Sequence, residues 1–329
     1  MNRSELITRG LVLGAALSAI ALPLAFWWRV PLVHARMAEA GGWNPAVMRA
    51  TVGEPLHLRL TSDDVVHGFA VGHLDTPAVD VLPGKVSEVT LVFDEPGTYT
   101  YYCTRWCGLN HWRMRGTIEV QGDQPATVAI NPPLYVSLGI DLDADRGAQA
   151  LPAAKPVADA AEAALEAAPD RYRSVEYYRS HSPASVWQDL RAEAVFQDLD
   201  DQEVWGLTAR LWRSNASPAV LAEGRELFAQ NCAACHGEQG AGDGVFADNL
   251  AASTSQAAEH SPDQAASMIQ KPASLADSSR MLAASPALLH GKILRGGMGT
   301  GMPSWGPLLT DSQVWSLVAH LYSFQFEYR

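Results

Sequence analysis

The feature that most constrains this chain is a cluster of four metal-binding side chains within twelve residues. They are Cys103, Cys107, His111 and Met114. Thiolate and thioether sulfur select copper over hard cations, and imidazole also suits copper. A single blue-copper site uses one cysteine, whereas two thiolates on one loop can bridge two copper ions into a delocalised centre. The spacing therefore predicts a dinuclear copper site.

Two other chemistries fit part of this motif. A structural zinc site could use two cysteines and two histidines, but zinc has no use for the thioether of Met114. Redox-active dithiols usually have the spacing C-x-x-C. A dinuclear centre needs a second imidazole, and His67, at the end of an apolar strand, is the best candidate. His57 and His73 are rivals, although His57 alternates with leucines and is expected to face solvent.

A second motif, Cys232-Ala-Ala-Cys235-His236, has the C-x-x-C-H pattern of covalent haem c attachment. Both cysteines would form thioethers to the haem, and His236 would be the proximal iron ligand. All four cysteines of the chain fall in the two motifs, so none is left for a structural disulfide. Because haem is attached in this way outside the cytoplasmic membrane, the motif predicts a periplasmic location.

Residues 219–329 as a whole resemble class I cytochromes c, in which a methionine before proline is the sixth iron ligand. The resemblance implies that Met302 has this role, with Met298 as the rival. Met268 and Met281 are expected to be core or surface residues. Axial histidine and methionine together raise the haem potential.

Residues 11–28 form an uncharged, largely apolar run of eighteen residues. Roughly 17–25 residues span a bilayer as a helix. Bulky side chains end the run where a signal peptidase would need small ones, so we expect a retained single-pass anchor rather than a cleaved signal peptide. Orientation follows from the haem, which places the remaining domains on the periplasmic side of the cytoplasmic membrane. The net charge of −12 argues against nucleic acid as a partner.

We therefore expect a multidomain chain with a transmembrane helix, an all-β domain and an all-α domain. The predicted parts are an anchor (1–30), a copper domain (31–122), an Ala/Pro-rich linker (123–180), a helical haemless half-repeat (181–218) and a cytochrome c domain (219–329). Short alternating segments with turn residues between them predict the strands. The half-repeat rests on the likeness of residues 199–212 to residues 309–322. Two unrelated helices with similar caps are the alternative.

Residues 61–122 resemble subunit II of haem-copper oxidases, which carries the dinuclear CuA centre, and the B-type oxidases are nearest. The matching motifs are Asp64-Val-Val-His67-Gly-Phe, Val81-Leu-Pro-Gly84, Pro96-Gly-Thr-Tyr, Cys103-x3-Cys107-Gly-Leu-x-His111-x2-Met114 and Gly116-Thr-Ile. The resemblance implies a Greek-key cupredoxin fold. The implied ligands are the bridging Cys103 and Cys107, one imidazole per copper from His67 and His111, the weak ligand Met114 and the main-chain carbonyl of Arg105.

The chain departs from these relatives at Arg105, where many have a glutamate that also helps to bind magnesium. An arginine cannot do so, and no magnesium site is expected here. Many relatives also have two membrane helices, whereas one is expected in this chain. The aromatic patch through which electrons commonly enter such subunits is not evident, and a fused cytochrome would replace it.

The expected function is electron transfer without catalysis, as a subunit of an oxidoreductase. Electrons would pass from a cytochrome c or quinol-oxidising complex to haem c, then to CuA, and on to a catalytic subunit I that reduces oxygen to water. An equivalent subunit of a nitric oxide reductase is the alternative, because the acceptor is chosen by the partner. A copper-delivery protein would need an exchangeable site, to which a bridged pair is poorly suited. A nitrous oxide reductase would need a histidine-rich cluster that the ten histidines do not form.

Overall fold

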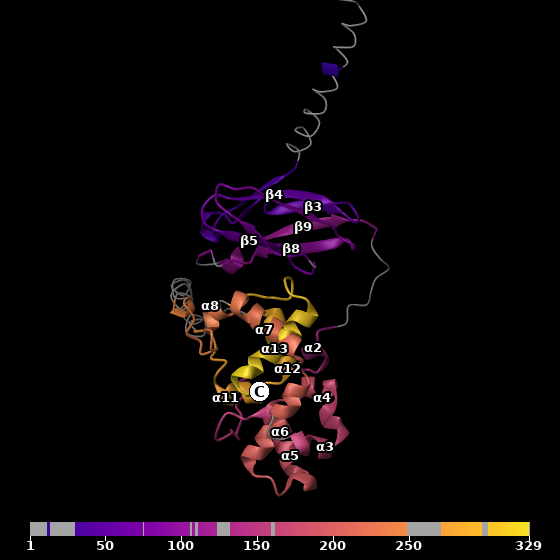
Figure 1. Ribbon diagram of the computed structural model, residues 1–329, viewed down its shortest axis with the longest axis vertical. Coiled ribbons are helices and arrows are strands. Elements are labelled where there is room, and N and C mark those ends of the chain that lie inside the picture. The colour runs from indigo at the N-terminus through magenta and orange to yellow at the C-terminus, as the bar shows by residue number, and fades with distance from the viewer. Residues whose placement is uncertain are drawn as a thin grey trace, which may run out of the picture. The chain divides into compact units, whose positions relative to one another are not determined.

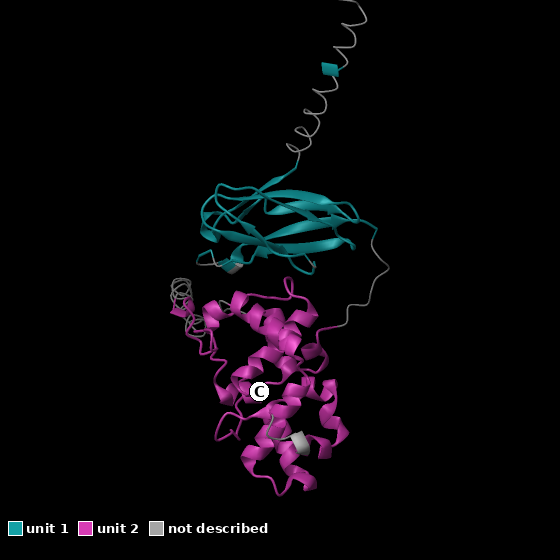
Figure 2. Ribbon diagram, viewed as in Figure 1, with its two compact units in different colours: residues 1–127 teal, residues 128–329 magenta. Residues whose placement is uncertain are grey.

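The computed structural model describes residues 12–13, 30–74, 76–105, 107–108, 111–123, 132–158, 162–248, 271–297 and 302–328. The chain divides into two compact units, residues 1–127 and residues 128–329 (Figure 2). Nearly all of the predicted membrane anchor lies outside the described residues. Within the described part of the chain, no helix has the length and apolar character needed to cross a bilayer. The anchor therefore stays a prediction.

The first unit is built from two β-sheets (Figure 1). One sheet has the order β2 (Trp43–Asn44), β1 (Leu32–Ala35), β4 (Leu56–Ser62) and β7 (Ser87–Leu91). The other has the order β3 (Val47–Thr51), β9 (Arg115–Gln121), β8 (Gly97–Cys103), β5 (His67–Val71) and β6 (Val79–Val81). Neighbours in space are often distant in sequence, as a Greek-key sandwich requires. The predicted all-β domain is confirmed.

Alternation along the strands builds the core between these sheets. Leu58 and Leu60 of β4 are buried, as are Phe69 of β5 and Tyr101 of β8. His57 lies between half-buried Leu56 and buried Leu58 and faces solvent, where its ring is hydrogen-bonded to Thr90 of β7. Leu58 and His57 thus lie on opposite faces of the sheet, one packed on the core and the other exposed to solvent.

The second unit is helical, as predicted. Its helices are α2 (Leu134–Ser137), α3 (Glu162–Ala167), α4 (Val175–Ser180), α5 (Pro183–Ala192), α6 (Asp201–Ser214), α7 (Pro218–Asn231), α8 (Ala233–His236), α11 (Ser278–Ala283), α12 (Pro286–Arg295) and α13 (Asp311–Leu321). Helices α7 and α13 pack closely against each other. Gly224 of α7 allows this approach, because a Cβ there would lie 2.0 Å from the carbonyl oxygen of Ser316.

Two helix pairs in this unit begin in the same way. A serine caps both α5 and α12, and each helix has proline in its first turn. Both α6 and α13 start with a capping box, in which the cap and the third helical residue exchange hydrogen bonds. These starts satisfy backbone N–H groups that a helix leaves unpaired.

Stacked rings also occupy equivalent places in the two pairs. Trp187 of α5 stacks on Trp205 of α6, with ring centroids 5.5 Å apart. His290 of α12 stacks on Trp315 of α13, with centroids 4.1 Å apart. Each ring of these pairs stands five residues after its helix cap. These correspondences support the interpretation of a repeat, which stays our interpretation.

Most of the predicted linker belongs to the helical unit. The backbone N–H of Ala158 donates to the carbonyl of Glu327 at 3.0 Å. The guanidinium of Arg295 donates to both carboxylate oxygens of Asp143, at 2.7 and 2.6 Å. The segment 123–180 also contains α2, α3 and α4. Helix α3 lies in the Ala-rich part of this segment. The predicted domain boundaries stay predictions.

Candidate copper and haem sites

Strand pairing brings the first two copper ligands together. His67 is the first residue of β5, and Cys103 is the last residue of β8. These strands run antiparallel, with Phe69 opposite Cys103. The loop that follows β8 is closed at its base, because the backbone N–H of Cys103 donates to the carbonyl of Met114 at 3.1 Å. Sheet register therefore positions both ends of the predicted copper loop.

Five predicted ligand side chains form one buried group. The sulfurs of Cys103 and Cys107 are 3.9 Å apart, well beyond the length of a disulfide bond. The Cys103 sulfur lies 3.7 Å from Nδ1 of His67, and the Cys107 sulfur lies 3.5 Å from Nδ1 of His111. Met114 places its sulfur 3.3 Å from that of Cys107. Each thiol thus has its own imidazole, and the sulfurs are separated by a gap that ions can bridge.

The rival histidines are placed elsewhere. His57 is exposed on the other sheet, and His73 is exposed in the turn after β5. Among the described residues, the group suited to a metal ion consists of His67, Cys103 and Cys107, with all candidate ligand atoms within 4.8 Å of one another. The geometry therefore favours His67 as the second imidazole.

Arg105 contributes to this site through its backbone. Its carbonyl oxygen lies 3.2 Å from the Cys103 sulfur. Its guanidinium forms a two-pronged ion pair with Asp80 of β6, at 2.9 and 3.1 Å. Asp80 is the cross-strand partner of Gly68, the residue after His67. The ion pair thus fastens the middle of the cysteine loop to the strand beside β5. The expected lack of magnesium ligation at Arg105 stays a prediction.

Asp64 orients His67 from behind. Its carboxylate lies 2.7 Å from Nε2 of His67, so that Nδ1 faces Cys103. The backbone N–H groups of Met37 and Val65 also donate to this carboxylate. Burial raises the pKa of Asp64, but these hydrogen bonds outweigh it and hold the pKa below its usual range. A charged carboxylate behind a ligating imidazole fixes its tautomer and increases its basicity.

Cys103 and Cys107 shift the pKa of each other in opposite directions. The thiol of Cys107 stabilises the thiolate of Cys103 and lowers the pKa of Cys103, despite the opposing effect of burial. The same interaction raises the pKa of Cys107, and burial adds to the increase. The second proton is therefore released when cations bind, as expected for a site that binds metal through two thiolates.

Trp43 is a neighbour of the site that sequence reasoning missed. Its indole N–H donates to the carbonyl of Met114 at 3.1 Å. Its ring packs edge-on against Phe69 and Tyr101, and its centroid lies 6.4 Å from that of His67. No sequence pattern indicates this role, because Trp43 is not part of any of the motifs that predict the copper site. Asp64 did carry a signal, as a carboxylate three residues before a predicted ligand.

The haem motif lies where α7 ends. Cys232 is the C-cap of α7, and the short helix α8 carries Cys235 and His236. Backbone N–H groups of Cys235 and His236 both donate to the carbonyl of Cys232, at 3.1 and 2.9 Å. Both thiols are half-buried and free of disulfides. A single tight turn thus presents two thiols and an imidazole together.

The donor set suits haem iron. Nδ1 of His236 lies 3.0 Å from the carbonyl oxygen of Ala273, so it carries the proton and leaves Nε2 as the ligand atom. Burial lowers the pKa of His236 and outweighs this hydrogen bond, which keeps the ring neutral. A neutral imidazole oriented by a backbone carbonyl is the form that binds a metal. The residues present therefore fit a covalent haem c.

Met302 lies in a segment held against the end of α12. Its carbonyl accepts from the backbone N–H of Gly297 at 3.1 Å, and Ser304 donates to the carbonyl of Leu294 at 2.8 Å. The side chain is half-buried. Met281 is in the core, as expected. The rival Met298 lies outside the described residues, as does Met268, and the choice of Met302 stays a prediction.

Known families match both parts of the chain. Residues 43–121 match the family described as cytochrome c oxidase subunit II, periplasmic domain. Residues 219–321 match the family described as cytochrome c oxidase, cbb3-type, subunit III. The resemblance of the β domain to oxidase subunit II, and the cytochrome c character of the helical domain, are confirmed.

Curated relatives agree with the first match. Two proteins of Thermus thermophilus named cytochrome c oxidase subunit 2 are each 41% identical over 85 residues, which is 26% of this chain and 62% and 50% of theirs. The chain thus spans less than two thirds of the length of these relatives. Among solved structures, the periplasmic domain of subunit II of cytochrome oxidase from Bradyrhizobium japonicum is 28% identical. It matches over 23% of this chain and 54% of that one, with a TM-score of 0.22.

Proposed function

We propose that this chain is the subunit through which electrons enter a membrane haem-copper oxidase, by way of haem c and then a CuA centre. The observation that carries the proposal is the pairing of the two cysteine sulfurs, 3.9 Å apart, each beside its own histidine. A site for one copper ion would need only one cysteine with its histidine. Two thiols with two separate imidazoles match the ligand demand of two copper ions.

Bound copper supplies a redox pair that shares one electron between two ions. The protein contributes rigidity, because Cys103 and His67 are fixed by strand register and the Arg105 to Asp80 ion pair fastens the loop between the cysteines. It also excludes water, since all five ligand side chains are buried. Ligands that cannot relax keep the geometry of both oxidation states similar, which favours fast electron transfer.

Covalent haem c supplies a one-electron carrier in the second unit. Cys232 and Cys235 would tether it, with His236 and Met302 as axial ligands. Histidine and methionine ligation sets a high potential. Joining the two centres in one chain makes the transfer between them intramolecular, with an effective concentration set by the connecting segment.

Catalysis is assigned to other subunits. The chain would pass electrons to a haem-copper catalytic subunit in the cytoplasmic membrane and receive them from a cytochrome c or a quinol-oxidising complex. Residues 1–30 would be a single-pass anchor, with both metal domains on the periplasmic side. A chain with a net charge of −12 suits a basic electron donor.

Electron paramagnetic resonance of the copper-loaded protein tests the proposal. A mixed-valence pair gives a multi-line copper spectrum, and two copper ions per chain are expected by metal analysis. A four-line spectrum from one type 2 copper ion, or a single bound zinc ion, would reject the CuA assignment. Turnover of the co-purified complex with oxygen and with nitric oxide then separates an oxidase from the alternative, a nitric oxide reductase.

A further inference from the structure

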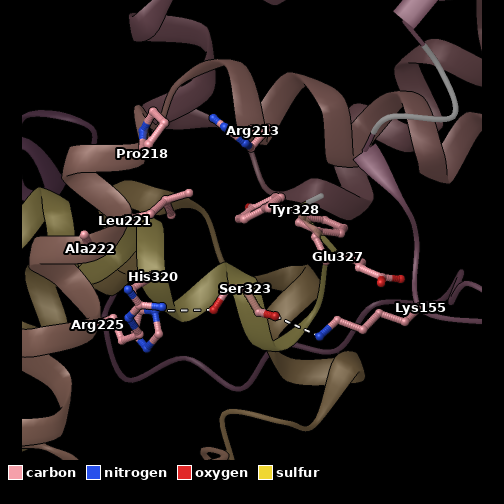
Figure 3. A pocket seen from close by; sticks show the side chains of 11 residues that line it. Lys155, Arg213, Pro218, Leu221, Ala222, Arg225, His320, Ser323, Glu327 and Tyr328 are labelled. Atoms are coloured by element: carbon pink, nitrogen blue, oxygen red, sulfur yellow. Dashed lines mark hydrogen bonds between the residues drawn. The ribbon is translucent and has the colours of Figure 1, made fainter.

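A pocket of about 450 Å³ lies in the second unit, away from the proposed haem ligands. It forms where the end of α6 and the start of α7 meet the last turn of α13 and the C-terminal residues, with Lys155 at its rim (Figure 3). None of the proposed copper or haem ligands lines it. Its volume is within the usual range for pockets that bind small molecules.

The lining is rich in positive charge. The lining contains three cations, Lys155, Arg213 and Arg225, and one carboxylate, Glu327, in a chain whose net charge is −12. Elsewhere in the described residues, arginines are commonly paired with carboxylates, as Arg295 is with Asp143. The three pocket cations form no ion pair with a carboxylate in the described part of the chain.

Two of these cations are held in place by backbone carbonyls. Lys155 donates to the carbonyl of Ser323 at 2.8 Å, and Arg213 donates to that of Ala216 at 2.6 Å. A carbonyl fixes the direction of a side chain without neutralising its charge. Arg225 has no hydrogen-bond partner among the described residues. The lining therefore retains donors that a ligand could use.

His320 lies near Arg225 in this lining. Burial lowers its pKa to about 4, and the nearby charge of Arg225 adds to the shift. Its ring is neutral at pH 7 and lies 3.4 Å from the hydroxyl of Ser323. An apolar wall completes the pocket, formed by Leu221, Phe326 and Tyr328.

We propose that this pocket binds a phosphate ester with a small apolar organic part. Three cations against one carboxylate leave two positive charges, which match the charge of about −1.5 to −2 on a phosphate monoester. Guanidinium forks suit phosphate oxygens, and an ammonium adds a point charge. The apolar wall would contact the organic part. A soluble phosphate monoester carries this charge, whereas a phospholipid headgroup is a phosphodiester with one negative charge that offers the same phosphate oxygens to the guanidinium groups.

The position of the pocket couples the ligand to the haem domain. Arg225 is on α7, which ends at the haem-bearing turn, and His320 is on α13, which packs against α7. A phosphate held between Arg225, Arg213 and Lys155 would link α7 to α6 and to the segment before α3. Because such a ligand binds the folded state, it raises the melting temperature of this unit.

Calorimetry on the full-length protein with its haem and copper tests the proposal. The probes are butyl phosphate, uncharged butanol, and vesicles of phosphatidylglycerol or phosphatidylcholine. Butyl phosphate should bind, and R225Q or K155Q should weaken it by about tenfold or more. K85Q is the matched control, because Lys85 is an exposed cation in the other unit, with no carboxylate partner in the described residues, and should leave the affinity unchanged.

The probes also identify the source of the ligand. Binding of phosphatidylglycerol vesicles that R225Q abolishes, without binding of butyl phosphate, supports the lipid headgroup. Binding of butyl phosphate alone supports a soluble ester. Equal binding of butanol, no binding of any probe up to ~10 mM, or affinities unchanged in R225Q and K155Q would overturn the proposal. None of these results depends on electron transfer.

Discussion

The copper and haem sites differ in how the chain brings their ligands together. The five proposed copper ligands with buried side chains lie on adjacent strands or on the loop between β8 and β9. The proposed haem ligands are half-buried, with three on one turn after α7 and the fourth on a segment after α12. A sheet register preforms the first site, whereas the second depends on helix packing and on a covalent bond. We therefore expect copper to be removable without unfolding, and haem attachment to be needed for the helical unit.

Cys235→Ala offers the strongest test of this difference. Loss of one tether should abolish most covalent haem and reduce the helical order of the second unit, since the site no longer fixes its cofactor. Haem staining after denaturation and far-ultraviolet circular dichroism measure both effects. The copper spectrum of the same protein should be unchanged. Simultaneous loss of both signals would show that the two units do not fold independently.

Cys103→Ser is the matching change in the copper site. A hydroxyl cannot replace a bridging thiolate, so the mixed-valence copper spectrum should disappear while the haem spectrum is retained. Because the strands position the remaining ligands, the melting temperature of the β unit should fall only slightly. Extensive unfolding of this variant without copper would contradict a preformed site. Metal analysis and thermal unfolding are the measurements.

Met302→Ala tests the fourth haem ligand. Removal of the thioether should convert low-spin haem to high spin, or to a weaker sixth ligand, and lower the reduction potential. Met298→Ala is the control and should retain the low-spin spectrum. The opposite pattern would assign the role to Met298. Visible absorption and redox titration distinguish the two.

Gly224→Ala tests whether the haem domain depends on the crossing of α7 and α13. A Cβ at this position would lie 2.0 Å from a backbone oxygen, so the helices would have to separate. We expect the second unit to lose about 1–3 kcal/mol of unfolding free energy. Gly147→Ala is the control, since nothing lies within 4 Å of its Cβ. Equal melting temperatures for the two variants would contradict a tight crossing.

Asp80→Asn should have the smallest effect. Asp80 and Arg105 are both more than half exposed, so loss of the ion pair should cost less than about 1 kcal/mol of stability. The copper hyperfine pattern should nevertheless shift, because the carbonyl of Arg105 is freed from its fixed place. Glu119→Gln breaks another exposed pair in the same unit and should leave the pattern unchanged. If both variants give the native copper spectrum, the ion pair does not position the loop.

Sequence alone determined the chemistry of both sites. The spacing of Cys103, Cys107, His111 and Met114 specified soft ligands on one loop, and C-x-x-C-H specified the haem turn. These patterns are readable because their members are close in sequence. The β and helical character of the two units was likewise predicted from local periodicity.

Only the tertiary structure decided which distant residues complete the sites. His67 was one of three candidates until the pairing of β5 with β8 placed it beside Cys103. Trp43 and Asp80 contact the copper loop from other strands. No pattern in the neighbouring sequence predicts such contacts. The same holds for the predicted linker. Its Asp143 forms an ion pair with Arg295, which lies 152 residues away in the sequence. Strand register and helix packing set these contacts, and both depend on burial summed over the whole unit rather than on neighbouring residues.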